Sequence, residues 1–409
     1  MEHIKRKRAA PVGRELAQHS GAQAGETVTA SLNAQAQRPI EAGDFDATEG
    51  SLVGAGRKRA GALEGRALAA AKTFGLRGKA ALARQRHGEA AENFAAAAAM
   101  LPPGHEDVAF AYLNAEADAF YREAARSGGR EAFESAIASY RKLTVARPRD
   151  SFPDDWAMMQ LRLGATLQTL GEFTGECGPL EDAAAAYCAA LQELSRARTP
   201  QLWAMAQMSL GTALFRLGEK QPGTEKLNEA VSAYREALEE HSRERAPLDW
   251  ARTSLNLGAA LEALARRDDG TARLIEAIEL YREALQDGIR RAPVLWAMIQ
   301  ISLGNALSLL CEREGKSERL REAANAYREA LAALDADSAP VQWAAAQMYL
   351  GDVLLTLGKK REGRAELGEA LSAYGAALQI ICQRAHSPPG GGRCRQSGHG
   401  IVAYRRTAE

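Results

Sequence analysis

The chain has 409 residues, and its 52 Lys and Arg balance its 52 Asp and Glu, so its formal net charge is zero. A chain of this length can hold two or three ordinary domains or one extended repeat array. Because the charge is balanced, no overall field would attract nucleic acid or an anionic membrane, and we expect partner recognition to be local. The five cysteines are odd in number and lack C-x-x-C spacing, which favours reduced thiols and a cytoplasmic location over a disulfide framework.

Residues 1–60 mix Gly, Ala, Gln and charged residues without sustained periodicity, so they predict a flexible arm with one helix beginning near Arg57. The arm carries two basic patches, Lys5–Arg8 and Arg57–Arg59. No aromatic residues interleave with them, so we predict a solvated arm and no nucleic-acid partner. No apolar stretch follows the first patch, so we expect no secretory signal. The glycines of "VGAGRKRAG" at 53–61 lack dinucleotide-binding spacing and favour a linker.

Residues 61–385 predict one repeat array. Its clearest signal is tryptophan, which recurs at spacings of 47, 47, 46 and 47 residues. The repeating tryptophans are Trp156, Trp203, Trp250, Trp296 and Trp343. A proline precedes each tryptophan by three residues, a glycine follows it by eight, and a tyrosine follows it by 31. The glycines are Gly164, Gly211, Gly258, Gly304 and Gly351. The resulting units are 152–198, 199–245, 246–291, 292–338 and 339–385, and the one missing residue lies between Tyr281 and Trp296.

Each unit predicts two helices. The proline suits the first turn of a helix, where its missing N–H would be unpaired in any case. Leucines at 7, 11 and 14 residues after the tryptophan, such as Leu210, Leu214 and Leu217, form one apolar stripe. Two helices this short cannot bury their own apolar faces, so neighbouring pairs must stack into a solenoid. We expect the glycine to permit close helix approach and each tryptophan to be buried against the preceding unit.

Upstream, residues 71–104 form a shorter unit with Gly78, Ala90, Phe94, Ala97 and Pro102 at the spacing of a 34-residue tetratricopeptide repeat. Residues 105–151 form a degenerate unit in which Ala109 and Ala117 replace the tryptophan and the glycine. The sequence thus resembles a tetratricopeptide repeat (TPR) protein with extended units of about 47 residues, similar in style to kinesin light chains. The resemblance implies an all-α, right-handed α-solenoid of stacked antiparallel helix pairs.

The resemblance also implies a concave groove lined by the first helix of each unit, at positions two, six and nine after the tryptophan. The candidate groove residues are Met158, Arg162, Met205, Ser209, Thr212, Arg252, Asn256, Met298, Ser302, Asn305, Tyr349 and Asp352, with Ala165, Ala259 and Ala345 completing the positions. Methionines at helical spacing can equally be core residues. As a groove, the set is adaptable and amphipathic, which suits a peptide or an amphipathic helix. An apolar residue replaces the first of the paired asparagines of some relatives, and their basic clamp is reduced to Arg252 beside Asn256, which argues against a terminal-carboxylate ligand.

Residues 292–311 run for 20 positions without a charge, which is about the length of a membrane span. Segments at the same phase of the other units carry Arg162, Arg216, Arg252 or Asp352, so we predict a buried helix and no membrane insertion. After Ala385 the pattern stops, and residues 386–409 predict a Gly-, Arg- and Pro-rich disordered tail. The last unit would then present Leu378, Ile381 and Cys382 without a following helix.

The sequence contains no complete catalytic or cofactor-binding motif. "GKS" at 315–317 lacks the glycine of a phosphate-binding loop five residues earlier, where Leu310 stands, and it follows a helix. The seven histidines are scattered without zinc-ligand spacing, so we predict no metal. We therefore predict a protein without enzymatic activity or cofactor that binds a protein or peptide partner. The alternative is a structural or regulatory array that self-associates as a homo-oligomer through its open C-terminal face.

Overall fold

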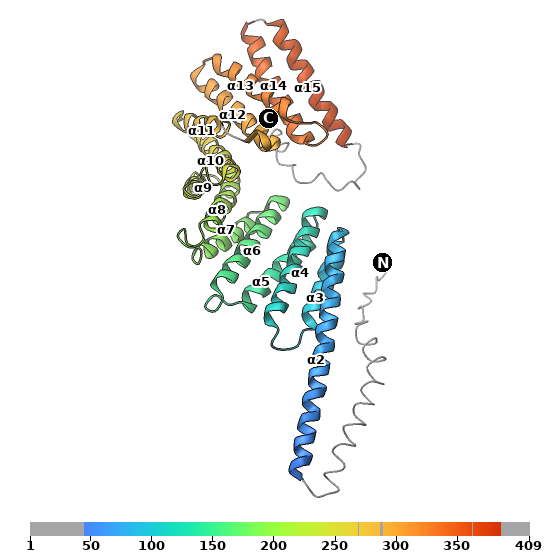
Figure 1. The fold of residues 1–409 in the computed structure, drawn as a ribbon. Helices are drawn as coiled ribbons and strands as arrows, with labels where there is room; N and C mark the ends of the chain where they lie inside the picture. Colours follow the sequence, from blue (N-terminus) through green and yellow to red (C-terminus); the bar gives the residue numbers. More distant parts are fainter. Residues whose placement is uncertain (1–44, 269, 287–288, 362, 386–409) are drawn as a thin grey trace, which may run out of the picture.

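The computed structural model describes residues 45–268, 270–286, 289–361 and 363–385, and within these ranges every regular element is a helix (Figure 1). In chain order the helices are α2 (Phe45–Ala83), α3 (His87–Ala99), α4 (Glu106–Ser127), α5 (Arg130–Ala146), α6 (Pro153–Thr174), α7 (Cys177–Leu191), α8 (Pro200–Lys220), α9 (Glu225–Leu238), α10 (Pro247–Arg267), α11 (Ala272–Ala284), the 3-10 helix η1 (Ile289–Arg291), α12 (Pro293–Glu314), α13 (Glu318–Ala333), α14 (Pro340–Arg361) and α15 (Arg364–Ala385).

Each long unit contributes two antiparallel helices, and each helix packs mainly on its neighbours in sequence. The first helices also contact one another, α6 with α8, α8 with α10, α10 with α12, and α12 with α14. We call these five helices the inner wall, and the second helices α7, α9, α11, α13 and α15 the outer wall. Figure 1 shows the pairs stacked side by side into a curved array. The predicted all-α solenoid of TPR-like units is confirmed.

The helix boundaries follow local sequence chemistry. Proline occupies the first turn of α6, α8, α10 and α12, where its missing N–H costs no hydrogen bond. Helices α6 and α12 end at Gly175 and Gly315, whose φ angles of +76° and +73° lie in the left-handed region. Such a glycine lets the chain turn sharply while its N–H caps a carbonyl of the last helical turn.

The glycine eight residues after each tryptophan permits close helix approach, as its recurrence predicts. In all five long units, a Cβ placed on this glycine would come within 3.0 Å of the ring of the tyrosine on the second helix. Gly78 and Phe94 make the same contact in the short unit. The tyrosines at this position in four consecutive units, Tyr140, Tyr187, Tyr234 and Tyr281, are 0–2% exposed. A glycine and an aromatic ring therefore form the repeated core contact.

A second close approach was not predicted from the sequence. Fifteen residues after the tryptophan, Gly171, Gly218 and Gly358 face a leucine near the start of the second helix, and an added Cβ would clash with it. Ala265 and Cys311 hold this position in the other two units, and both are buried. The sequence signal was a small residue at this position in every long unit. Glycine itself stands there in only three of the five units, so its spacing did not reveal the contact.

The prediction that each tryptophan is buried is wrong for four of the five. Trp296 is 5% exposed, whereas Trp156, Trp203, Trp250 and Trp343 are only half-buried. The expected packing on the preceding unit holds for Trp343, which contacts a cluster that contains Ala330 of α13 and Leu334, the residue that follows this helix. An arginine from the preceding connection covers the indole face in three units, with Arg149, Arg243 and Arg290 at 5.3, 4.5 and 5.2 Å from the ring centroid. The guanidinium takes the place that a second apolar layer would fill.

The expected flexible arm over residues 1–60 is corrected in its second part. Helix α2 begins at Phe45 rather than near Arg57, and its first half projects away from the array (Figure 1). Residues 57–66 of this helix are exposed, so the sequence needs no apolar stripe there, and periodicity could not reveal the helix. Residues 1–44 of the arm and the tail at 386–409 lie outside the described residues.

Helix α12 is the one described helix that is long and apolar enough to cross a membrane, with a mean hydropathy of 1.7 over its most apolar window. Within the array, 56% of that window is buried. Leu303, Leu307 and Leu310 pack in the same core cluster as Leu257 and Leu261 of α10. The side chains of α12 therefore contribute to the core of the solenoid.

Candidate functional site

The candidate groove residues lie on the inner-wall helices, and most are half-buried. Met205 and Met298 are the most exposed of the methionines among them, at 39% and 40%. Arg252 is also exposed, and its only described ion pair joins it to Asp249 one turn earlier, at 3.3 Å. Asn256, in the middle of the wall, is half-buried. These four side chains are the candidates that remain available to a ligand.

Other candidates are engaged within the protein. Thr212, Asn305 and Asp352, nine residues after the tryptophan, accept hydrogen bonds from the hydroxyls of the core tyrosines of their own units at 3.1, 2.7 and 2.6 Å. Their first role is therefore to satisfy a buried phenol, which would otherwise cost free energy. Burial also raises the pKa of Tyr234 well above its ordinary value. The sequence analysis placed these residues on the correct helix, but it assigned them to a ligand groove rather than to the tyrosine hydroxyls.

Three further candidates also contact core aromatic residues. Ser209 and Ser302 lie near the hydroxyls of Tyr187 and Tyr281 of the preceding units, where they oppose the rise in the tyrosine pKa that burial causes. Tyr349 stacks on Tyr327, with ring centroids 5.8 Å apart. These contacts join successive units, so substitution of these residues would perturb packing as well as any ligand.

Arg162 forms an ion pair across two units. Its guanidinium contacts the carboxylate of Asp118 on α4, and the same carboxylate accepts a hydrogen bond from Tyr140 at 2.5 Å. Burial and the hydrogen bond to Asp118 raise the pKa of Tyr140 above its ordinary value. Arg162 therefore ties the degenerate unit to the first long unit instead of presenting a free cation.

A buried carboxyl lies at the centre of the inner wall and was missed in the sequence. Glu262 on α10 is 5% exposed, accepts a hydrogen bond from Tyr281 at 2.6 Å, and lies 3.4 Å from Arg266. Burial raises its pKa to about 7. It stands twelve residues after the tryptophan, where Gln168 and Ser308 stand in two other units and Phe215 and Leu355 in the remaining two. Gln168 likewise accepts a hydrogen bond from the core tyrosine of its unit, Tyr187, at 3.2 Å. The recurrence of a polar residue at this position in three units was the available signal.

The outer wall is held together differently. A row of arginines, each directly after a core tyrosine, forms ion pairs with carboxylates one unit further on. The pairs are Arg141–Asp182, Arg235–Glu276, Arg282–Glu322 and Arg328–Glu369, at 3.7, 2.6, 2.6 and 2.9 Å. All eight side chains are substantially exposed, so each pair contributes little stability.

A third set of contacts joins the ends of the inner-wall helices. A basic residue seventeen positions after the tryptophan reaches the carbonyls of the preceding unit's inter-helix loop. Lys220 donates to the carbonyl of Gly175 at 3.0 Å, Arg267 to those of Gly218 and Gly223, and Arg313 to that of Gly270 at 2.6 Å. Carbonyls at helix ends lack partners within the helix, so these side chains cap them from the next unit.

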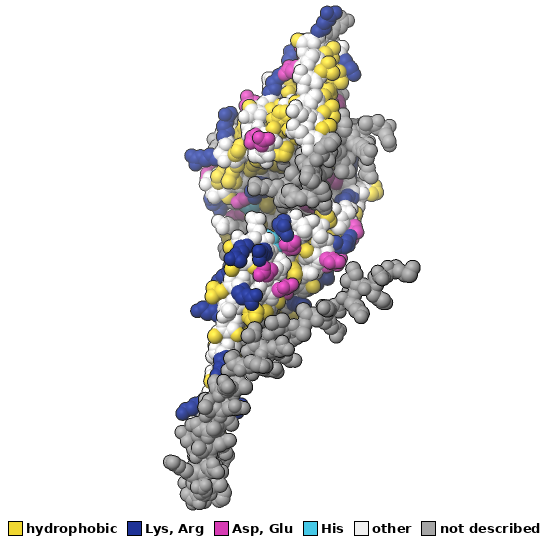
Figure 2. Space-filling view, turned by 90° about the vertical axis from the view of Figure 1, so that its right-hand side faces the viewer, with side chains coloured by type: hydrophobic (Ala, Val, Ile, Leu, Met, Phe, Trp, Pro, Cys, Tyr) yellow, Lys and Arg dark blue, Asp and Glu magenta, His cyan; other side chains and the backbone are white. Residues whose placement is uncertain are grey.

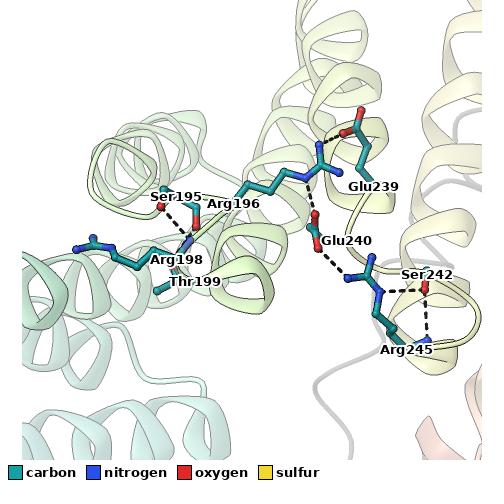
Figure 3. A network of polar contacts seen from close by, with 8 residues as sticks. All are labelled: Ser195, Arg196, Arg198, Thr199, Glu239, Glu240, Ser242 and Arg245. Atoms are coloured by element: carbon teal, nitrogen blue, oxygen red, sulfur yellow. Dashed lines mark hydrogen bonds and ion pairs between the residues drawn. The ribbon is translucent and has the colours of Figure 1, made fainter.

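An arginine precedes the tryptophan in the first four long units, and it has acidic partners in three of them. Arg149 binds Glu193, and Arg196 binds both Glu239 and Glu240 at the end of α9 (Figure 3). Arg196 lowers the pKa of Glu240 through a direct hydrogen bond. Figure 3 shows that Glu240 also contacts Arg245, at 3.3 Å, so that two successive connections meet at one carboxylate.

The outer face of α15 carries exposed apolar side chains. Leu371 and Leu378 are 73% and 59% exposed, whereas Val231, Ile278 and Ala324, at the phase of Leu371 in earlier units, are buried. Leu238 and Leu285, at the phase of Leu378, are half-buried. Hydrophobic side chains gather over the upper end of the molecule, where α15 lies (Figure 2). In earlier units the next inner-wall helix covers this face.

Within the described residues, no group of three or more His, Cys, Asp and Glu side chains is placed to hold a metal ion. Cys177, Cys188, Cys311 and Cys382 form no disulfide with one another within the part of the chain that the structure describes. His241 is buried and contacts Thr253 at 3.0 Å, and burial lowers its pKa.

No family model matches the chain, and no curated protein matches it. Among solved structures, BtubC (BKLC) from P. vanneervenii is 18% identical over 65% of this chain and 94% of its own, with a TM-score of 0.44. The TPR2AB domain of yeast Sti1, solved as a complex with pHSP90, is 18% identical over 76% of this chain and 98% of its own, with a TM-score of 0.25. A circular tandem repeat protein is 17% identical over 97% and 94%, with a TM-score of 0.32. These similarities concern fold alone, and the helix pairs described above identify the chain as a TPR-like α-solenoid.

Proposed function

We propose that the protein is a scaffold without enzymatic activity that binds a peptide or an amphipathic helix of another protein along its inner wall. The observation that carries the proposal is the set of available side chains there, Met205, Arg252, Asn256 and Met298, which lie on three consecutive helices. Exposed methionines adapt to varied apolar surfaces. The guanidinium and the amide can hydrogen-bond to peptide backbone or to polar ligand side chains.

The engaged candidates sharpen this proposal. Thr212, Asn305 and Asp352 already accept hydrogen bonds from tyrosines, and Arg162 already has an ion pair. The ligand should therefore depend most on the central units of the wall, between Met205 and Met298, and less on Arg162. A ligand with an apolar face and a hydrogen-bonding edge fits this distribution.

The test is an affinity capture from the native cell extract with two matched variants. The inner-wall variant carries Arg252→Glu and Asn256→Ala, which are exposed or half-buried positions outside the tyrosine core. The control variant carries Arg235→Ala, which removes one outer-wall ion pair. We expect a partner to be retained by the intact chain and the control and to be lost from the inner-wall variant. A set of partners that is identical for all three proteins would overturn the proposal.

A second candidate function is self-association through α15. The observation that favours it is the 73% exposure of Leu371 at a phase where earlier units bury the side chain. Sedimentation velocity at micromolar concentration should then show a dimer or larger species, and Leu371→Glu should return it to a monomer. A monodisperse monomer of the intact chain would exclude this candidate and leave the inner-wall proposal untouched.

A further inference from the structure

The last outer-wall helix, α15, carries glycine at two positions where earlier units carry larger side chains. At the position of Gly368, the earlier residues are Glu181, Asn228, Ile275 and Arg321. At the position of Gly375, directly after the core tyrosine, they are Cys188, Arg235, Arg282 and Arg328. Both glycines are exposed, and a Cβ placed on either would meet no atom within 4 Å. Crowding within the chain therefore does not explain them.

The two glycines alternate with exposed apolar or uncharged side chains along one face of α15. Leu371 and Leu378 are 73% and 59% exposed, and Cys382 is exposed one turn later. The residues of this face follow one another at intervals of three and four, the spacing at which one helix contacts another along its length. We call them the α15 seam: Gly368, Leu371, Gly375, Leu378 and Cys382.

The opposite end of the array does not offer a matching surface. In α12, which has a preceding unit, the residues three, seven and ten positions after the tryptophan are buried; they are Ile299, Leu303 and Ala306. In α2, aligned through the close contact of Gly78, the same positions are exposed; they are Thr73, Arg77 and Ala80. This end carries polar and small side chains where later helices carry apolar ones. Head-to-tail stacking would therefore place the leucines of the seam against polar side chains.

We propose that α15 pairs with α15 of a second copy of this chain in an antiparallel contact with two-fold symmetry. The proposal rests on the second candidate function, self-association through α15, and gives it an arrangement. The alternation of glycine and leucine makes the seam complementary to itself, as a two-fold contact requires. In one antiparallel register, Leu371 lies over Gly375 of the partner subunit and Leu378 over Gly368 of the partner subunit, so that each leucine fills the space above a glycine.

The charges of this face also favour a second copy as the occupant. Near a two-fold axis, a side chain lies close to its own copy, so a charge there meets a like charge. The seam has no charged residue, and Gly375 replaces the arginine that three earlier units carry. In an exposed helix, a glycine costs about 1 kcal/mol relative to alanine. Close approach of a second helix gives both glycines a role that contacts within the chain do not.

The seam is separate from the proposed peptide groove. It lies on the outer-wall helix α15, and none of its residues is a groove candidate on the inner wall. A dimer formed through the seam would therefore keep two grooves, and a partner with two binding segments would gain avidity from them. Variants of one surface should leave the other measurable.

The first experiment is sedimentation velocity of the full chain over a series of concentrations. We expect a monomer–dimer equilibrium without larger species, because a two-fold contact closes on itself. Gly375→Arg restores the side chain of Arg282 and Arg328, which outer-wall helices of this chain accept, and should weaken dimerisation by about tenfold or more. Ser372→Arg, at an exposed position of α15 outside the seam, should leave dimerisation unchanged. Circular dichroism of the monomers should show that Gly375→Arg is no less stable than the intact chain, since arginine favours a helix more than glycine does.

A second readout tests the register. A disulfide needs Cα atoms closer than about 7 Å. Oxidation of an equimolar mixture of Leu371→Cys and Gly375→Cys chains should therefore give a linked dimer, because these positions face each other across the contact. Neither variant alone should give more linked dimer than the intact chain, whose own cysteines set the background.

The outcomes separate this proposal from the others. A monomer at every concentration would overturn both the two-fold contact and the second candidate function, and the inner-wall proposal would stand. A dimer that Leu371→Glu abolishes but Gly375→Arg and the mixed oxidation leave unaffected would overturn the two-fold contact alone. Species that grow beyond a dimer as the concentration rises would also overturn it.

Discussion

The contacts between the two walls and the contacts along the outer wall use opposite means to hold the same repeat together. Within each unit, an inner-wall helix and an outer-wall helix meet through buried contacts, such as the ring of Tyr234 on α9 against Gly211 on α8 and the hydrogen bond of its hydroxyl to Thr212. On the outer wall, the helices are bridged by long, exposed side chains, such as Arg282 and Glu322. Buried contacts resist substitution because cavities and unpaired groups are costly, whereas exposed ion pairs are screened by water. Equally regular sequence patterns can therefore differ greatly in their contribution to stability.

The largest effect should follow from removing a ring that is buried between the two walls. Tyr234→Ala deletes a side chain that is 1% exposed and leaves a cavity opposite Gly211, so we expect a loss of about 3–5 kcal/mol in the free energy of unfolding. Tyr234→Phe keeps the ring and removes only the bond to Thr212, so it should cost about 1 kcal/mol. Urea denaturation followed by circular dichroism measures both. Equal losses for the two variants would show that the hydroxyl, and not ring packing, holds the two helices of the unit together.

The next effect concerns the buried carboxyl of the inner wall. The pKa of Glu262 is raised from 4.5 to about 7, so the folded state holds its proton over a range in which the unfolded state has lost it. The stability that this proton provides is complete below about pH 4.5 and is lost as the pH rises through about 7. Above that pH, the buried charge costs on the order of 3 kcal/mol.

Glu262→Gln keeps the acceptor for Tyr281 and removes the charge. Relative to the intact chain, its free energy of unfolding should therefore rise between pH 5 and pH 8, by up to about 3 kcal/mol. Urea titrations at the two pH values measure this difference. The exposed Glu312 provides the control, since Glu312→Gln should track the intact chain. Parallel pH profiles for Glu262→Gln and the intact chain would contradict the assignment.

A smaller effect should come from the basic residues that cap the preceding unit. Arg267→Ala removes hydrogen bonds to the carbonyls of Gly218 and Gly223, and water can replace part of them because Arg267 is exposed. We expect a loss of about 1 kcal/mol in the free energy of unfolding. Hydrogen exchange should show faster opening of the α8–α9 loop before any change elsewhere. Unchanged hydrogen exchange in this loop would show that its carbonyls do not depend on the hydrogen bonds of Arg267.

The repeat was readable from the sequence because Pro, Gly and Tyr each do one job in every unit. Their spacing predicted the helix starts and a close helix approach at Gly211, both of which the structure shows, whereas Tyr234 as the partner of that glycine was found only in the structure. Side-chain partners within a unit could not be read in the same way. Whether Asn305 faces a ligand or the hydroxyl of Tyr327 depends on how the two helices of the unit are rotated about their axes, and the repeat spacing does not encode that rotation.

The candidate site was predictable only in part, for the same reason. Met205, Arg252 and Met298 are exposed on the inner-wall helices, at positions that the resemblance to tetratricopeptide repeats assigns to a groove. Glu262 stands where Gln168 and Ser308 stand in two other units, and its role as the acceptor for Tyr281 emerges only from the structure.

The smallest effect should come from the outer wall. Arg282→Ala removes an ion pair with Glu322 whose side chains are 47% and 44% exposed, so the loss should be about 0.5 kcal/mol and should shrink as salt is added. The double variant with Glu322→Ala should match either single variant, because the partner that is left remains hydrated. A loss comparable to that of Tyr234→Ala would mean that the row of arginines acts as a connected network. The contrast between the buried contacts of each unit and the exposed ion pairs would then fail. A loss of only about 0.5 kcal/mol would mean that the exposed residues of the outer wall can vary in sequence without loss of the fold. The buried residues between the two walls cannot vary in the same way.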